Sequence, residues 1–83
     1  MQVDTQELAG RCEALARFAL MLAAQMEEAG VISGPSLTAS MRQTADGLSF
    51  PAEHRQSAAR TMRELAGALD DARMFRQARA GRA

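Results

Sequence analysis

The sequence predicts an all-α protein, and three observations lead to this fold class. Apolar residues recur every three or four positions in three separate segments, as they do along one side of a helix. β-branched residues are few and never alternate with polar ones, so no strand is predicted. Glycine and proline stand between the segments, where helices end and begin. We expect a single domain over residues 1–83, a helical hairpin of two long antiparallel helices plus a short middle helix, assembled as a dimeric helical bundle.

The first predicted helix covers about residues 5–29. Asp4 is a suitable N-cap, and Glu7 would complete a capping box with it. Gly30 suits the left-handed position that follows a helix, from which Val31 would fold back onto Met26. Spacings of four and three residues mark one stripe of this helix as its core side: Leu8, Cys12, Leu15, Ala19, Leu22 and Met26.

Two further helices are predicted after breaks in the pattern. The short middle helix covers about residues 35–46, with Pro35 at its start and Gly47 as its stop. Its apolar side consists of Leu37, Met41, Ala45 and Leu48. The third helix covers about residues 52–77 and is followed by a frayed tail, 78–83. Its stripe consists of Ala58, Met62, Leu65, Leu69 and Ala72.

The core that these helices can form is small, because 18 of the 39 apolar residues are alanine. A domain of this size buries only about 60% of the surface of its unfolded chain. A single cysteine allows no internal disulfide, so a second copy of the chain is the expected supplement. The first helix is apolar on all sides from residue 18 to 24, which places a homodimer interface at Ala14, Phe18, Met21 and Leu22. The alternative is that the middle helix covers Phe18 and Met21.

The sequence offers no set of residues for catalysis, a cofactor or a metal. It lacks a glycine-rich phosphate loop, a paired-cysteine motif and a serine-centred elbow. His54 is the only histidine, and Cys12 lies on the predicted core stripe, where a thiol reacts poorly. The longest apolar run is far shorter than the ~20 residues that cross a bilayer. We therefore expect a cytoplasmic protein that is not an enzyme and has no membrane partner.

A partner-binding site is predicted at the end of the third helix. Met74 and Phe75 lie off the stripe among basic residues, and aromatic and arginine side chains are enriched in binding hot spots. The predicted site, which would bind an acidic or apolar surface of another protein, consists of Arg73, Met74, Phe75, Arg76 and Arg79. Two alternatives remain: Phe75 covers the end of the first helix or a dimer seam, or the arginines bind a nucleotide or nucleic acid. Acidic residues among the arginines argue against nucleic acid.

Charge is divided along the chain. Residues 1–50 hold six acidic residues and three arginines, whereas residues 51–83 hold four acidic residues and seven arginines, so the halves carry about −3 and +3. The two long helices should therefore attract each other when they lie antiparallel.

In size and simplicity the chain resembles small helical accessory proteins that act by occupying a partner, such as secretion co-chaperones, anti-activators of transcription factors and phage-encoded inhibitors. The resemblance covers the whole chain but involves no particular motif. It implies a non-enzymatic adaptor or inhibitor.

Overall fold

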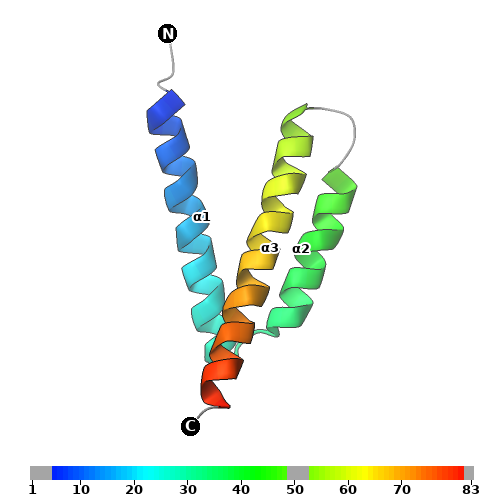
Figure 1. Cartoon of the computed structure of the whole chain (residues 1–83). Coiled ribbons are helices and arrows are strands. Elements are labelled where there is room, and N and C mark those ends of the chain that lie inside the picture. Colours follow the sequence, from blue (N-terminus) through cyan, green and yellow to red (C-terminus); the bar gives the residue numbers. More distant parts are fainter. Residues whose placement is uncertain (1–4, 49–52, 82–83) are drawn as a thin grey trace.

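The computed structural model describes residues 5–48 and 53–81, which form three helices: α1 (Thr5–Glu28), α2 (Gly34–Leu48) and α3 (Glu53–Ala80). These residues contain no strand, which confirms the all-α prediction. α2 lies alongside α3, whereas α1 diverges from them, so the molecule has the shape of a V (Figure 1). The end of α1 and the end of α3 meet at the closed end of the V, which we call the vertex.

The predicted end of α1 is confirmed. Gly30 has a φ of +75°, and the backbone N–H of Val31 donates to the carbonyl of Met26 at 2.9 Å. The N–H of Gly30 donates to the carbonyl of Glu27 at 3.0 Å, which completes a Schellman motif. The expected N-cap of α1, Asp4, lies outside the described residues.

α2 is longer than predicted at both ends. Ser33 caps it, because the N–H of Ser36 donates to the Ser33 hydroxyl at 3.3 Å. Gly47 does not stop the helix, which continues to Leu48. The two added residues bring Leu48, three residues after the buried Ala45, to a half-buried position.

α3 also continues further than predicted, to Ala80, so residues 78–80 are not a frayed tail. Residues 78–80 contain no glycine or proline, and the N–H of Gly81 still donates to the carbonyl of Gln77 at 3.0 Å. The predicted start of this helix at residue 52, and the connection before it, lie outside the described residues.

The closest packing joins α2 to α3 and consists mainly of small side chains. The buried residues are Gly34, Thr38, Ala45, Ala59, Ala66 and Leu69. Facing alanines let the two helix backbones approach closely. Leu37, Met41 and Leu48 are half-buried beside them, as predicted, whereas Ala58 and Ala72 of the predicted α3 stripe are exposed. The stripe prediction was wrong at these two positions because the packed side of α3 is centred on Ala59 and Ala66.

The expected hairpin of two long helices in contact along their length is not what the structure shows. α1 has no buried residue, and its positions 5–15 are all exposed. The predicted core stripe of α1 is therefore wrong for five of its six residues: Leu8 is 50% exposed, Leu15 is 69% exposed, Cys12, Ala19 and Leu22 are exposed as well, and Met26 alone of the six is half-buried. α2, and not α1, packs closely along α3. α1 turns a different side toward the other helices, with half-buried residues at Ala16, Leu20, Ala23 and Glu27.

Candidate functional site

Ion pairs fasten α1 to α3 at the vertex. The Oε1 atom of Glu27 lies 3.3 Å from Nη1 of Arg73 and 3.6 Å from Nη2 of Arg76. Nε of Arg76 lies 3.2 Å from Oε1 of Glu28. These contacts join acidic residues of α1 to basic residues of α3, as the division of charge along the sequence predicts. The Glu27 side chain is only 12% exposed, so solvent screens this pair less than the pairs on open helix faces.

A second set of ion pairs joins α2 to α3. Nη2 of Arg42 donates to Oδ2 of Asp70 at 2.7 Å, and Arg73 donates to the other carboxylate oxygen. The pKa of Asp70 is lowered, mainly because Arg42 donates a hydrogen bond to its carboxylate. Burial of the carboxylate raises the pKa, but the hydrogen bond from Arg73 also lowers it, so the net shift is downward. The same Asp70 carboxylate raises the pKa of Arg73. Arg73 thus contacts acidic groups of both α1 and α3.

Glu27 also lies against the start of α2. A Cβ atom on Gly34 would collide with the Glu27 carboxylate, so the position requires glycine while Glu27 keeps its place. A carboxylate beside the first residue of a helix is favourable, because the free N–H groups there carry partial positive charge. Glu27 therefore links all three helices at the vertex.

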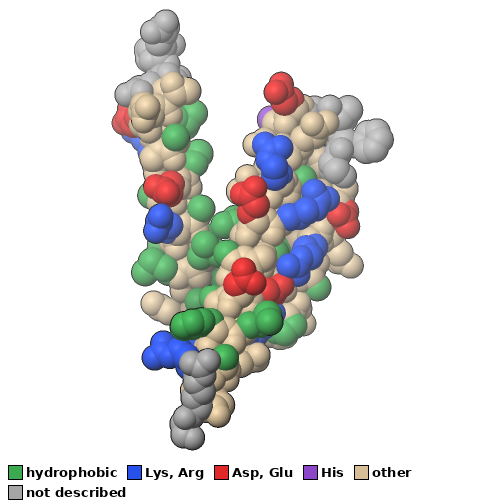
Figure 2. Space-filling view, viewed as in Figure 1, with side chains coloured by type: hydrophobic (Ala, Val, Ile, Leu, Met, Phe, Trp, Pro, Cys, Tyr) green, Lys and Arg blue, Asp and Glu red, His purple; other side chains and the backbone are tan. Residues whose placement is uncertain are grey.

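Above the vertex, an apolar cavity of about 220 Å³ lies between the three helices. Its lining consists of Ala19, Leu20, Ala23, Leu37, Met41, Leu65 and Leu69. Apolar side chains are visible on α1 and α3 where the V opens above it (Figure 2). Leu20 is not part of the predicted core stripe of this helix. Its spacing of four from Ala16 and three from Ala23 is the signal that would have identified this side of α1.

The large apolar side chains that the fold leaves exposed gather on α1. We define the α1 surface as Leu8, Leu15, Phe18, Met21 and Leu22, which are 47–69% exposed. Of the predicted dimer residues, Phe18, Met21 and Leu22 belong to this surface, and Ala14 is exposed as well. The alternative that the middle helix covers Phe18 and Met21 is wrong, since these side chains are 64% and 62% exposed.

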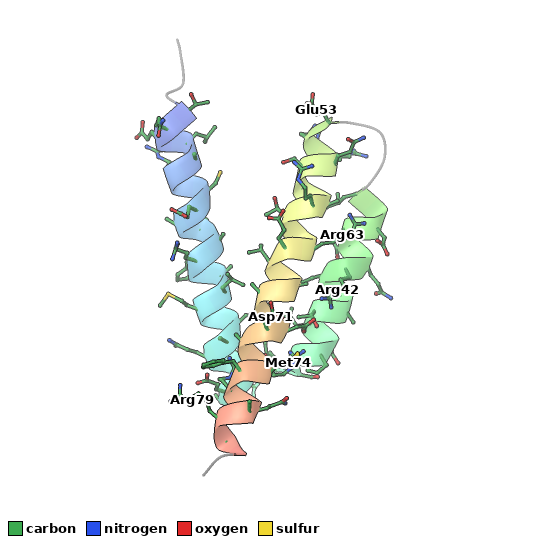
Figure 3. The ribbon with its side chains drawn as sticks, viewed as in Figure 1. Arg42, Glu53, Arg63, Asp71, Met74 and Arg79 are labelled. Carbon is green, nitrogen blue, oxygen red and sulfur yellow. The ribbon has the colours of Figure 1, made fainter. Side chains whose placement is uncertain are left out.

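The predicted partner site at the end of α3 is only partly brought together. Arg73 and Arg76 turn toward the acidic residues of α1. Phe75 is 66% exposed, and the guanidinium carbon of Arg79 lies 6.0 Å from the centre of its ring. Met74 is also exposed, but successive helix positions point about 100° apart. Figure 3 shows Met74 and Arg79 on different sides of α3. We call Phe75 with Arg79 the C-terminal surface.

Other chemistry has little support among the described residues. They contain no group of three or more histidine, cysteine or acidic residues placed to hold a metal. A shallow hollow of about 250 Å³ at the vertex is lined by Glu27, Glu28, Arg73 and Arg76, so carboxylates face any anion that enters it. Within the described ranges, no helix has both the length and the apolar character to cross a membrane.

Comparisons with known proteins gave no relative: no family model matches the chain, and neither a curated protein nor a solved structure matches it. Function is therefore inferred from the residues and contacts of the chain itself.

Proposed function

We propose that the protein is a small non-enzymatic binding module, an adaptor or inhibitor that attaches to a partner protein through its C-terminal surface. The observation that carries this proposal is the exposed ring of Phe75. It lies on the last turns of α3, where the neighbouring arginines at 73 and 76 are engaged by α1 and the ring itself is two-thirds exposed. Exposed aromatic anchors beside an arginine are typical of binding hot spots.

The contacts of the arginines refine the chemistry of the partner. Arg73 and Arg76 have acidic partners within the chain, so they do not present free positive charge beside Phe75. Arg79 remains next to the ring, 6.0 Å from its centre. The fitting partner surface is an apolar pocket for an aromatic ring with one acidic group at its edge, rather than a broadly acidic surface.

The same contacts count against the nucleotide and nucleic-acid alternatives. Phosphate binding requires several basic groups that face the ligand together. Here two of the arginines at the end of α3 are paired with carboxylates. Binding through several arginine–phosphate contacts would weaken steeply between low and moderate salt, and binding through Phe75 would not.

Site-specific photocross-linking in cells of the source organism tests the proposal. A photoreactive phenylalanine analogue at position 75 should cross-link one partner protein, whereas the same analogue at Gln43, an exposed position on α2, should not. With that partner purified, Phe75→Ala should reduce affinity about 30-fold, which corresponds to about 2 kcal/mol. Arg79→Glu should reduce it as well. Arg76→Glu is not a suitable test, because it would also break the ion pairs of Arg76 with Glu27 and Glu28 at the vertex.

Circular dichroism provides the control. Phe75→Ala should leave the helical signal and the melting temperature unchanged, since the ring is largely exposed. If this variant unfolds the protein, or if position 75 cross-links no more than position 43, Phe75 does not form a partner site.

A further inference from the structure

The chain exposes more surface than a compact protein of its size. Its accessible surface is 6512 Å², whereas a compact monomer of 8.9 kDa exposes about 4,800 Å². The radius of gyration is 15.2 Å, against about 12 Å expected for 83 residues. The surplus of roughly 1,700 Å² is about twice the 800 Å² that each partner contributes to a standard protein interface. The fold therefore leaves enough surface for a stable dimer.

The exposed side of α1 has the pattern of a helix-pairing seam. Leu8, Leu15 and Leu22 are spaced seven residues apart. Cys12, Ala19 and Met26 alternate with them at intervals of four and three, so the two series occupy the d and a positions of three heptads. We call these six residues the α1 seam. The chain itself packs a different side of α1, centred on Leu20 and Ala23, and so leaves most of the seam uncovered.

We propose that the α1 seam pairs antiparallel with the α1 seam of a second copy of this chain. In full antiparallel overlap, Leu8 lies opposite Met26 of the second copy, Leu15 opposite Ala19, and Leu22 opposite Cys12. Two of these three layers then match a large residue with a small one, which fills space evenly. A parallel pair would place alanine on alanine and cysteine on cysteine, which leaves voids, and leucine on leucine in the next layer.

The residues that flank the seam favour a second copy over a foreign helix. Charged e and g positions usually choose the partner of a paired helix. Here the e positions are Ala9, Ala16 and Ala23. The g positions are Arg11, Phe18 and Gln25, of which only Arg11 is charged. Pairing of two copies therefore brings few like charges together. Because the e and g positions are mostly uncharged, they do not favour a foreign helix of opposite charge. Ala19 belongs both to the seam and to the lining of the apolar cavity, so the second copy would also cover the mouth of that cavity.

Light scattering tests the pairing with matched variants of the full chain. The wild type should have twice the chain mass of 8.9 kDa at tens of micromolar. Leu15→Arg should be monomeric, because it places a charge at the centre of the seam. Gly10→Arg introduces the same residue on the far side of α1, where an added Cβ atom meets nothing within 4 Å, and it should remain dimeric. A monomeric wild type, or equal masses for the two variants, would overturn the proposal.

Oxidative cross-linking tests whether the two α1 helices run antiparallel or parallel. This test does not require that the Leu15→Arg variant remain folded. In the antiparallel pair the two Cys12 residues are about ten helix positions, or ~15 Å, apart, which is too far for a disulfide. Wild-type chains should therefore not cross-link, whereas the double variant Cys12→Ala, Phe18→Cys should, since position 18 lies near the twofold axis. A Cys12 disulfide would show parallel pairing and refute the proposal. If either of these tests fails, the proposal for the C-terminal surface still stands, because Phe75 is outside the α1 seam.

Discussion

Leu69 is the residue whose truncation should cost the protein most stability. It is 5% exposed, and it is the only large apolar side chain that is buried among the described residues. Leucine-to-alanine changes in cores cost about 2–5 kcal/mol. Leu69 also lines the cavity of about 220 Å³ between the helices, which already opens to solvent, so the change creates little new sealed void. We therefore expect a loss near the lower end, about 2–3 kcal/mol.

Thermal unfolding followed by circular dichroism measures this loss. For a domain of this size, each kcal/mol lowers the melting temperature by about 4–8 °C, so Leu69→Ala should lower it by about 8–24 °C. Met74→Ala is the matched control on the same helix, because Met74 is 63% exposed and should shift the melting temperature by no more than a few degrees. Both variants should be measured at one protein concentration, since association changes apparent stability.

Equal melting temperatures for Leu69→Ala and Met74→Ala would refute the reasoning. That result would mean that the packing of α2 on α3 does not hold the protein together, and that stability depends on contacts outside the single chain.

Three further predictions concern the Asp70 ion pairs, Gly30 after the end of α1 and Gly10 within it. The pKa of Asp70 is lowered in the folded protein, so its contribution to stability is present above its unfolded pKa of about 3.9 and is lost as pH falls through that value toward the folded pKa. Urea unfolding at a series of pH values should show that Asp70→Asn reduces this acid dependence and that Asp71→Asn, at an exposed neighbouring position, does not. Gly30→Ala should destabilise by about 1–2 kcal/mol because its φ is +75°. Gly10→Ala, in an open mid-helix position, should stabilise by about 0.5–1 kcal/mol, and the two melting temperatures should move in opposite directions.

Local signals in the sequence predicted the helices well. Gly30 and the fold-back of Val31 marked the end of α1 correctly, because this motif depends only on the short stretch from Met26 to Val31. Ser33 was an equally local signal for the start of α2, but the glycine and proline that follow drew the predicted boundary to residue 35. Gly47 was misread as a stop because a single glycine lowers helix propensity without ending a helix that packing continues.

The arrangement of the helices was less accessible, because it depends on which sides pack most closely. Large side chains dominate a search for stripes, yet the buried core consists of Ala45, Ala59 and Ala66 with few larger residues. Alanine is also common on exposed helix faces of this chain, so its pattern alone does not identify a packed side. For the same reason the contacts of Arg73 and Arg76 with α1 were visible only as a division of charge between the two halves of the chain.

The divergence of α1 has a consequence for the energetics of association. Residues 5–15 of α1 are all exposed, and within this stretch Glu7 forms an ion pair with Arg11 of the same helix. Isolated helices of this length are marginal in water, where melting and re-forming of a turn take under about a microsecond. Amide hydrogens should therefore exchange fastest at the open end of α1 and slowest near Glu27. A partner that covers α1 must order these turns, so its binding should release heat at the cost of entropy and weaken as temperature rises.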